Sequence, residues 1–419
     1  MTGTRTCTPT CADYREVRDL TEALAEPLSA EDQTVQSMPD VSPTKWHRAH
    51  TTWFFETFLL VPHLQGYRPF DPAFGYLFNS YYEALGKRHP RPERGLITRP
   101  GVAEIGAYRA HVDTAMAYLL ETANLTPELK DLILLGLHHE QQHQELLLMD
   151  IKHVLSRNPL QPGYRPLATA APKSPRPVHW LNHPGGLVEV GHQNDGFAFD
   201  NEGPRHRVWL QPFALADRAV TNGEWQAFMD DGGYRRPELW LSDGWAAVQA
   251  SGATAPLYWR CLDGSWAEFT LGGNEPLDPS RPVVHVSYYE ADAFARWSAA
   301  RLPTESEWEA VAASQPVEGR GLNLDRLRPE TGPAGDFGFF GDVWEWTASA
   351  YLPYPGFRPA AGAVGEYNGK FMVGQHVLRG GSCATPAGHV RPTYRNFFPP
   401  GAQWAFSGLR LARSLGGDR

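Results

Sequence analysis

The residues best suited to chemistry are imidazoles in the first third of the chain. Residues 138–143 read HHEQQH, and His139 and His143 within them are four positions apart. On a helix, residues four apart share one face, so both rings can reach the same metal ion. A lone histidine on a helix is more often a polar surface group or a satisfied core group, but the paired spacing favours a metal site.

The same residues fit the HExxH pattern of zinc proteases, in which Glu140 would act as the general base. The pattern alone does not distinguish hydrolysis from other metal chemistry. A third imidazole is available in residues 46–51, WHRAHT, where His50 and His47 are the candidates. With His50 the site would hold three neutral histidines, which leave a ferrous ion its full charge and about three open positions, although imidazole also suits zinc and copper.

Composition and charge narrow the class of protein. The chain has 419 residues, which favours two domains, and 42% of them are hydrophobic, as in folded proteins. The net charge of -9 is not typical of a nucleic-acid-binding protein, which carries an excess of Lys and Arg. Four scattered cysteines are too few for a disulfide framework. Residues 1–10 contain no apolar signal core and no apolar run reaches the roughly 20 residues of a membrane helix, so we expect a cytoplasmic protein.

Helical periodicity covers the first part of the chain. Apolar residues recur at helical spacing in residues 13–28, 46–60, 102–122 and 127–155, which predicts four long helices. Metal sites in antiparallel bundles of this kind are built from side chains on facing helices. We therefore expect a four-helix bundle over residues 1–160 that carries the imidazoles.

Helical periodicity ends after the predicted bundle. Residues 161–178 are rich in Pro, Ala, Ser and Lys without periodicity, which predicts a linker. Residues 179–419 contain short β-like runs with frequent Gly and Pro. Helical spacing returns only at residues 222–230, 289–300 and 305–313, so this part should form an irregular α+β domain.

Two stretches of the helical part resemble a known family. Residues 46–56, WHRAHTTWFFE, and residues 139–145, HEQQHQE, are similar to the DinB-type helical half of the EgtB family of ergothioneine sulfoxide synthases. The resemblance implies that three histidines bind Fe(2+), namely His50, His139 and His143. It also implies that Gln142 hydrogen-bonds the imidazole substrate, whereas on its own this residue would be an exposed helix Gln.

The loop between these helices adds candidates for substrate binding. In members of this family, arginines three apart hold the carboxylate of the thiol substrate, and Arg91 and Arg94 match that spacing. A guanidinium fork suits a carboxylate. As isolated residues these arginines would be solvated loop charges just as often.

The resemblance also implies an active-site tyrosine that donates a proton and suppresses simple thiol dioxygenation. We favour Tyr81 and Tyr82, which resemble a branch that delivers the tyrosine from the helical domain. Tyr351 and Tyr354 in the second half are the alternative. Either pair would otherwise pack structurally with its hydroxyls at the surface, as Tyr commonly does.

The second half resembles the formylglycine-generating, or sulfatase-modifying-factor, domain, which is an elaborated C-type-lectin-like fold. The resemblance covers about residues 180–413 and rests on motifs such as DNEGPRH at 200–206, RLPTESEWE at 301–309, GDVWEW at 341–346 and RGGS at 379–382. Formylglycine enzymes need a close pair of reactive cysteines after the last motif, and only Cys383 follows it here. That chemistry is not expected, and most of these motifs should be structural.

Residues 394–398, YRNFF, are the exception. In mycobacterial-type relatives the asparagine and the next aromatic hold the betaine substrate, which implies Asn396 and Phe397 here. An aromatic face attracts a trimethylammonium group by roughly 0.5–2 kcal/mol. Those relatives bind γ-glutamylcysteine with an acidic residue next and an arginine four positions later, where this chain has Phe398 and Ala402. The departure favours free cysteine as the thiol donor.

The sequence thus predicts an iron-dependent oxidoreductase in ergothioneine biosynthesis. It would use O2 to join the imidazole C2 of hercynine (Nα-trimethylhistidine) to the sulfur of cysteine or γ-glutamylcysteine as a sulfoxide. The expected fold is a DinB-like four-helix bundle followed by a C-type-lectin-like α+β domain. The alternatives are an ovothiol-type synthase acting on histidine, whose relatives usually carry an additional methyltransferase domain, a zinc hydrolase, and a non-catalytic lectin-like module. No nucleic-acid or membrane partner is expected, and a homo-oligomer and a structural calcium ion stay open.

Overall fold

The computed structural model describes residues 8–168, 176–193, 196–317, 319–332, 336–360 and 363–416. The chain divides into two compact units. The helical unit comprises Met1–Tyr164, Asn194–Phe199 and Pro359–Asn368, and the mixed unit comprises Arg165–Gln193, Asp200–Arg358 and Gly369–Arg419. The predicted linker at 161–178 and the domain limits on either side of it stay a prediction, and residues 169–175 of that segment lie outside the described residues.

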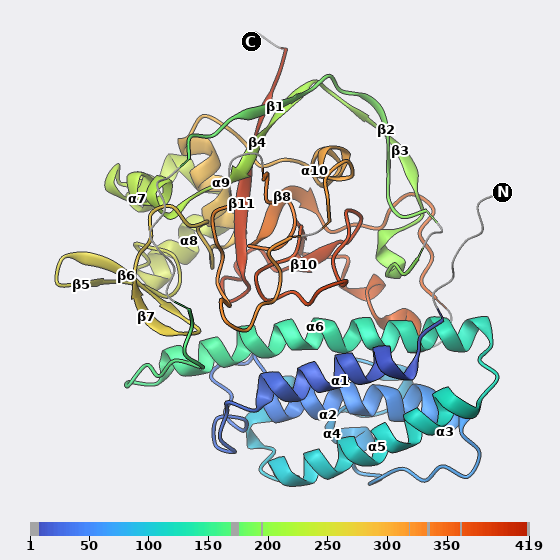
Figure 1. Cartoon of the computed structure of the whole chain (residues 1–419). Helices are drawn as coiled ribbons and strands as arrows, with labels where there is room; N and C mark the ends of the chain where they lie inside the picture. The colour runs from blue at the N-terminus through green and yellow to red at the C-terminus, as the bar shows by residue number, and fades with distance from the viewer. Residues whose placement is uncertain are drawn as a thin grey trace. The chain divides into compact units, whose positions relative to one another are not determined.

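The helical unit is built on long helices that lie side by side (Figure 1). They are α1 (Cys11–Ala25), α2 (Thr44–Phe55), α5 (Val102–Thr122) and α6 (Pro127–Arg157). Shorter turns complete the unit: η1 (Glu56–Leu60), α3 (Val61–His63), α4 (Phe74–Leu77), η2 (Glu83–Leu85), η3 (Arg91–Leu96) and η7 (Ala363–Glu366).

The four predicted helices are therefore present, with small differences at their ends. Helix α1 ends at Ala25 rather than at residue 28, because Pro27 has no N–H with which to extend the ladder. Helix α2 begins two residues earlier than predicted, and its continuation η1 is a π-helical turn next to Pro62, which cannot donate to the regular ladder.

Local signals in the sequence start two of these helices. Thr10 forms a capping box with Asp13, since its hydroxyl accepts from the Asp13 N–H at 3.2 Å while the Asp13 carboxylate accepts from the Thr10 N–H at 2.7 Å. Thr126 caps α6 with one hydrogen bond, since its hydroxyl accepts from the Leu129 N–H at 3.3 Å, and Pro127 occupies the first helical position.

Helix α2 runs through the interior of the helical unit. All 12 of its residues are buried, including Lys45, His47, Arg48 and His50. A buried polar group costs free energy unless it is hydrogen-bonded, so each of these side chains must find a partner inside the unit. The polar residues of α2 are consequently held in fixed positions.

The mixed unit contains a six-stranded sheet in the order β1-β4-β11-β8-β9-β10. Strands β8 and β11 are parallel, and the other neighbours are antiparallel. Its strands are β1 (Trp180–His183), β4 (Phe213–Ala219), β8 (Trp344–Ala350), β9 (His376–Arg379), β10 (Asn396–Phe398) and β11 (Ser407–Ser414). Two smaller antiparallel sheets pair β2 (Gly186–Val190) with β3 (His206–Leu210), and β5 (Trp259–Leu262) with β6 (Ser265–Thr270) and β7 (Gly273–Pro276).

The predicted helices of this unit are present as α7 (Asn222–Asp230), α9 (Tyr288–Trp297) and α10 (Glu305–Ala312). A further helix, α8 (Ser242–Ser251), was not predicted. Only Gly244 and Val248 of α8 are buried, so it lacks the apolar stripe that helical periodicity detects. Short turns lie at η4 (Asp200–Glu202), η5 (Gly233–Arg235), η6 (Pro237–Leu239) and η8 (Gly369–Phe371).

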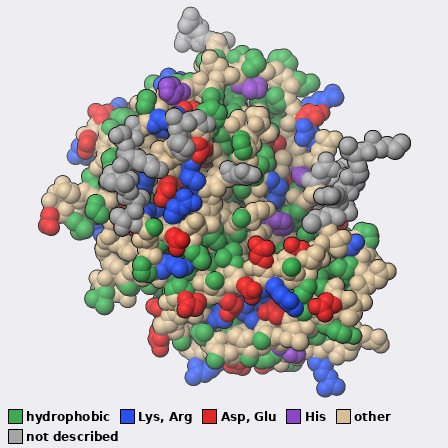
Figure 2. All heavy atoms as spheres, viewed as in Figure 1, with side chains coloured by type: hydrophobic (Ala, Val, Ile, Leu, Met, Phe, Trp, Pro, Cys, Tyr) green, Lys and Arg blue, Asp and Glu red, His purple; other side chains and the backbone are tan. Residues whose placement is uncertain are grey.

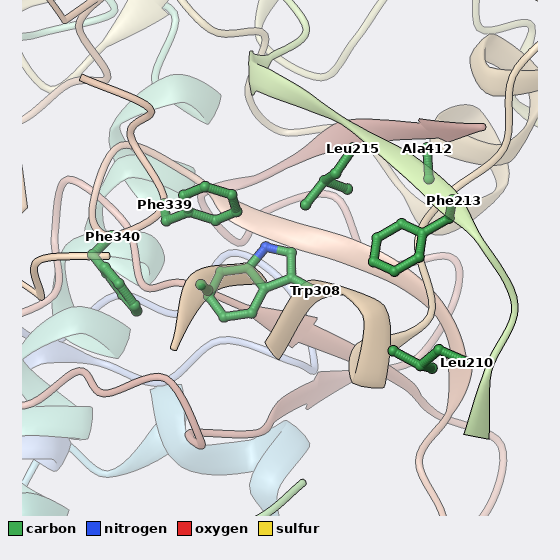
Figure 3. Close-up of a cluster of buried hydrophobic side chains, with 8 residues drawn as sticks. Leu210, Phe213, Leu215, Trp308, Phe339, Phe340 and Ala412 are labelled. Atoms are coloured by element: carbon green, nitrogen blue, oxygen red, sulfur yellow. The ribbon is translucent and has the colours of Figure 1, made fainter. Parts of the chain in front are cut away.

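The core of the mixed unit gathers around Trp308 of α10. Figure 3 shows its indole among apolar side chains of the sheet and of a long loop, including Leu215 and Phe339. The indole N–H donates to a carboxylate oxygen of Glu345 at 2.6 Å, and Arg410 pairs with the same carboxylate at 2.8 Å. A charged pair inside an aromatic core therefore helps to fix a unit that has little regular structure.

The surface carries charges of both signs. On the face drawn in Figure 2, acidic and basic side chains are interspersed rather than gathered by sign. No helix in the described part of the chain combines the length and the apolar character that crossing a bilayer requires.

Candidate metal centre

Three imidazoles converge inside the helical unit. His50 lies on α2, and His139 and His143 lie one turn apart on α6. One ring nitrogen from each lies within 4.8 Å of the others, and the Nε2 atoms of His50 and His139 are 3.2 Å apart. The structure thus brings together the three histidines that the sequence selects, in an arrangement that could hold a metal ion.

The orientation of His50 is set by its neighbours. Its Nδ1 donates to the Phe78 carbonyl oxygen at 2.6 Å, which leaves Nε2 to face the other two rings. The imidazole is stacked between Trp46, at 4.6 Å between centroids, and Trp53, at 5.6 Å. These contacts fix the ring before any ion arrives.

Burial keeps the three rings in their neutral form. It lowers the pKa of His139 to about 3, against a smaller opposing effect of the Glu140 carboxylate. Burial likewise holds the pKa of His50 and of His143 well below the ordinary range, and the neighbouring histidines lower both further. Neutral imidazole is the form that binds metals, so no proton has to leave these rings near neutral pH.

The spacing also fits a shared ion. Two nitrogens bound at about 2.1 Å lie about 3.0 Å apart at a right angle and about 3.4 Å apart at a tetrahedral angle. The 3.2 Å between the His50 and His139 nitrogens falls in that range. The donor set suits a divalent transition metal, and three imidazoles alone do not choose among iron, zinc and copper.

Glu140 of the HExxH pattern is committed elsewhere. Its carboxylate is fully buried and pairs with Arg18 at 2.7 Å and with Arg109 at 3.1 Å, and it accepts from the Thr21 hydroxyl at 2.7 Å. A general base must reach a water molecule bound at the metal. A carboxylate enclosed by two guanidinium groups is poorly placed for that role, which disfavours the hydrolase alternative.

The two neighbouring histidines are not members of the cluster. His47 hydrogen-bonds to His143 and to Asp150 through its two ring nitrogens. The His138 ring stacks on Phe197 with 3.9 Å between centroids. The choice of His50 over His47, which the sequence left to the resemblance, is thus supported by geometry.

The two predicted arginines lie in different surroundings. Arg94 is 3% exposed, stacks 3.4 Å above the centre of the Trp46 ring, and donates to the hydroxyls of Ser42 at 2.9 Å and Ser80 at 3.2 Å. Burial, and then the charge of Arg91, hold the pKa of Arg94 well below its ordinary value. Arg91 itself is exposed and donates to the Asp40 carbonyl oxygen.

Arg94 is the better anion receptor of the two. Within the described residues it forms no ion pair with a carboxylate, and its Nε has no hydrogen-bond acceptor. Buried charges in proteins are usually paired, so a buried guanidinium of this kind is suited to an incoming carboxylate.

Tyr82 is fully buried in the helical unit, with its ring 5.7 Å from Trp53 and 5.2 Å from Phe58. Its hydroxyl makes no hydrogen bond of ordinary geometry within the described residues. Burial raises its pKa far above the usual value, against a smaller lowering by the Tyr81 hydroxyl. Tyr81 stacks on Tyr82 with 4.8 Å between centroids. Tyr82 would therefore act as a phenol and not as a phenolate.

A third tyrosine, Tyr367, lies in the same unit and was not predicted. Its hydroxyl donates to the Gln142 side-chain oxygen, and its ring lies 5.6 Å from that of His139 and 6.0 Å from that of Tyr81. Tyr367 is more than 200 positions from α6 in the sequence, and no motif marks it. Gln142, which the resemblance implies as a substrate contact, thus lies next to the phenol of Tyr367.

Comparisons with known proteins agree with this architecture. Residues 13–147 match the DinB superfamily, and residues 167–329 and 325–415 match the sulfatase-modifying factor enzyme 1-like domain. A hercynine oxygenase from Mycolicibacterium thermoresistibile is 35% identical over 408 residues, covering 89% of this chain and 88% of that protein. Another from Mycobacterium tuberculosis is 33% identical, covering 89% and 91%. The chain belongs to the hercynine oxygenase family.

A further relative, ergothioneine biosynthesis protein 1 from Schizosaccharomyces pombe, is 28% identical, covering 52% of this chain and 28% of that protein. Membership of the hercynine oxygenase family makes this chain an enzyme of the oxygenase class, as the sequence predicted. The two-part fold predicted from the same resemblance is confirmed.

In this hercynine oxygenase homologue the remaining predicted residues belong to the mixed unit. Asn396 and Phe397 form part of β10. The Phe397 ring stacks on Tyr351 with 4.1 Å between centroids and lies 5.9 Å from Phe371. The Asn396 side-chain oxygen accepts from the Phe397 N–H at 2.9 Å, which leaves its amide group to contact a ligand.

The alternative tyrosines are used inside the mixed unit. The Tyr351 hydroxyl accepts from the Asn201 amide at 2.8 Å. The Tyr354 hydroxyl lies 3.1 Å from both Glu305 and Arg379, where it can donate to the carboxylate and accept from the guanidinium. Both hydroxyls are committed to buried polar networks, which favours a structural role for this pair.

Proposed function

We propose that this chain is an Fe(2+)- and O2-dependent sulfoxide synthase of ergothioneine biosynthesis. It joins the imidazole C2 of hercynine to the sulfur of cysteine or γ-glutamylcysteine. The observation that carries the proposal is the cluster of His50, His139 and His143, three neutral imidazoles of which two are buried and His143 is partly buried, in a chain of the hercynine oxygenase family. Hercynine, which the resemblance implies, is also the substrate in the names of these relatives.

The proposed reaction balances without an external electron donor. Hercynine, cysteine and O2 give the sulfoxide and one water molecule. Forming the C–S bond removes the C2–H and S–H hydrogens and supplies two electrons, and oxidation of sulfur to the sulfoxide supplies two more. Together these four electrons reduce O2, of which one oxygen atom ends on sulfur and the other in water.

The site would use its ion and its side chains in different ways. A ferrous ion held by the three histidines supplies the electron transfer to O2 that closed-shell side chains cannot provide. The protein's own part is to hold two substrates in reacting geometry and to control a proton. No carboxylate of the described residues belongs to the imidazole cluster, so a bound ion would keep its full positive charge, which favours thiolate binding.

We assign substrate contacts from the geometry and the family resemblance. Arg94 receives the carboxylate of the thiol substrate, with the exposed Arg91 in a supporting role. Gln142 holds the imidazole of hercynine. Asn396 and Phe397, which the family resemblance alone assigns, hold the trimethylammonium group, to which an aromatic ring contributes roughly 0.5–2 kcal/mol.

Tyr82 and Tyr81 are the proposed proton donors. The buried Tyr82 phenol lacks an ordinary hydrogen bond and keeps its proton, which suits a donor. Tyr367, beside Gln142, is the added candidate. Loss of the donor should divert oxygen to the sulfur of cysteine alone, so Tyr82→Phe and Tyr367→Phe should be compared by the ratio of sulfoxide to cysteine sulfinate.

Free cysteine is the proposed thiol donor. Phe398 and Ala402 stand where γ-glutamylcysteine-binding relatives have an acidic residue and an arginine. Neither side chain can bind the charged ends of a γ-glutamyl group. Higher kcat/KM with cysteine than with γ-glutamylcysteine is the expected result.

The test is oxygen uptake by the full chain loaded anaerobically with Fe(II). With hercynine and cysteine present, O2 should be consumed with stoichiometric formation of the sulfoxide, measured by mass spectrometry. Histidine in place of hercynine separates the ovothiol-type alternative, which predicts equal or faster turnover. Zinc loading and His139→Leu are the negative controls. Iron-loaded protein that binds both substrates but ignores O2 would overturn the proposal.

A further inference from the structure

His47 lies next to the imidazole cluster without belonging to it. It is three positions before His50 on α2 and only 3% exposed. Both of its ring nitrogens are engaged: Nδ1 lies 2.9 Å from Nδ1 of His143, and Nε2 lies 3.0 Å from Oδ2 of Asp150. His47 therefore connects a candidate metal ligand to a buried carboxylate.

Asp150 completes this chain of contacts from α6. It lies seven positions after His143, which is close to two helical turns, so both residues face α2 from the same side of α6. Asp150 is 3% exposed. Its Oδ2 also accepts from the Ser42 N–H at 2.7 Å, while Oδ1 has no hydrogen bond within the described residues.

The directions of these hydrogen bonds follow from what each group can donate. An ionised carboxylate only accepts, so Nε2 of His47 must carry the proton shared with Asp150. When His143 binds an ion through Nε2, its Nδ1 carries the proton and donates to Nδ1 of His47, which accepts. This places the His143 lone pair on Nε2, which is the atom left to bind an ion.

We propose that Asp150 and His47 are positioning residues that fix the tautomer and the orientation of His143 as a metal ligand. The proposal rests on the metal role given to His143 under the proposed function. A metal-bound histidine commonly donates its second N–H to a carboxylate or a carbonyl, which orients the ring and raises its basicity. Here the carboxylate acts through an intervening imidazole, and Ser42 holds the carboxylate in turn.

The three imidazoles of the cluster differ in this respect. His50 donates to the carbonyl oxygen of Phe78, and Nδ1 of His139 has no hydrogen bond within the described residues. In the described part of the chain, His143 is the member of the cluster that is linked to an anion. No carboxylate of the described residues belongs to the cluster itself, so this link is where a negative charge would act on an ion bound by His143.

The experiment measures metal affinity, by chelator competition with Fe(II) under anaerobic conditions and with Co(II). The variants are His47→Phe, Asp150→Asn and His47→Gln. Phenylalanine removes both hydrogen bonds, and asparagine removes the charge with little change of shape. Glutamine can accept from His143 and donate to Asp150, so it should restore the link. His153→Gln is the matched control, because His153 is a buried histidine of α6 that contacts Ser37.

His47→Phe and Asp150→Asn should weaken binding of both ions about 10–100-fold, the usual effect of losing the partner of a metal-bound histidine. The visible absorption of the Co(II) protein should change as well. His47→Gln should recover most of the affinity, and His153→Gln should behave as wild type.

Unfolding of the metal-free proteins distinguishes positioning from a structural role. Variants that lose stability but bind both ions as tightly as wild type, with an unchanged Co(II) spectrum, would overturn the proposal and leave the proposed function intact. A wild-type protein that binds neither ion would instead overturn the metal centre itself, and with it the positioning role of Asp150 and His47.

Discussion

Two sides of helix α6 differ sharply although they begin at adjacent residues. His139 and His143 face a cluster of neutral imidazoles. Glu140, one position from His139, faces Arg18 and Arg109 in a fully buried charged network. Successive residues of a helix point about 100° apart, so a motif that is continuous in sequence is divided between two environments.

The difference teaches how the HExxH pattern is used in this chain. On the imidazole side the groups are uncharged and their coordinating nitrogens converge. On the other side the groups form a connected hydrogen-bond network: Gln144 donates to the Thr21 hydroxyl at 3.0 Å, and Thr21 donates to Glu140 at 2.7 Å. The histidines of the pattern thus face the candidate metal site, whereas its glutamate ties α6 to α1 and α5.

The largest expected effect comes from removing a ligand. His139→Leu keeps about the volume of the ring and removes the nitrogen that would bind the ion. Loss of the hydrogen-bond partner of a metal ligand lowers metal affinity up to about 100-fold, and loss of the ligand itself should lower Fe(II) affinity further. O2 uptake should stop. The metal-free protein should lose no more than about 1.5 kcal/mol of unfolding free energy. Chelator competition and urea unfolding measure the two quantities, and retained Fe(II) binding would contradict the assignment.

Glu140→Gln should give the opposite result. Breaking a buried ion pair leaves uncompensated charge on Arg18 and Arg109, so the free energy of unfolding should fall by about 3–5 kcal/mol. Metal affinity of the folded protein should stay within about threefold of wild type, since the carboxylate does not reach the cluster. If turnover stopped while stability was unchanged, Glu140 would belong to the chemistry and the comparison would fail.

Gln142 and Gln144, two positions apart on α6, test the same comparison between its two sides. Gln142 lies on the imidazole side, and Gln144 donates to the Val17 carbonyl oxygen at 2.7 Å on the charged side. Gln142→Leu should raise the KM for hercynine about tenfold, which corresponds to one hydrogen bond. Gln144→Leu should leave KM unchanged and lower stability by about 1–3 kcal/mol. Steady-state kinetics and urea unfolding of both variants measure these quantities. A raised KM in Gln144→Leu with an unchanged KM in Gln142→Leu would contradict the comparison.

The smallest expected effect is on the acid dependence of stability. Burial raises the pKa of Glu140, but Arg18 and Arg109 together lower it below the ordinary value of about 4.3. A carboxyl with a depressed pKa contributes stability above its unfolded pKa and loses it as the pH falls through its folded pKa. The difference in the free energy of unfolding between wild type and Glu140→Gln should therefore become smaller below about pH 4.3. A difference in unfolding free energy that stays constant on acidification would contradict the pairing of Glu140 with Arg18 and Arg109.

Local features of the sequence predicted the parts of the site that depend on local structure. The four-residue spacing of His139 and His143 implies a shared face as soon as that segment is helical. The helices themselves follow from apolar periodicity, and their largest differences from the predicted ends lie next to Pro27 and Pro62, which interrupt the ladder.

Other parts of the site depend on residues far apart in the chain. The partner of Glu140 is Arg18, 122 positions away, and nothing in the HExxH pattern signals it. The choice between His47 and His50 turns on Asp150, 103 positions from His47. Tyr367 reaches Gln142 across 225 positions, from a segment that the sequence assigned to the second domain. Side-chain partners of this kind are set by tertiary packing, which a motif does not encode.

The most direct measurement is a crystal structure of the iron-loaded chain with anomalous scattering recorded at the iron edge. A single strong peak bonded to His50, His139 and His143, with Glu140 still paired to Arg18 and Arg109, is the predicted result. A peak that lacks any of these three imidazoles, or one bonded to Glu140 or His47, would contradict the account.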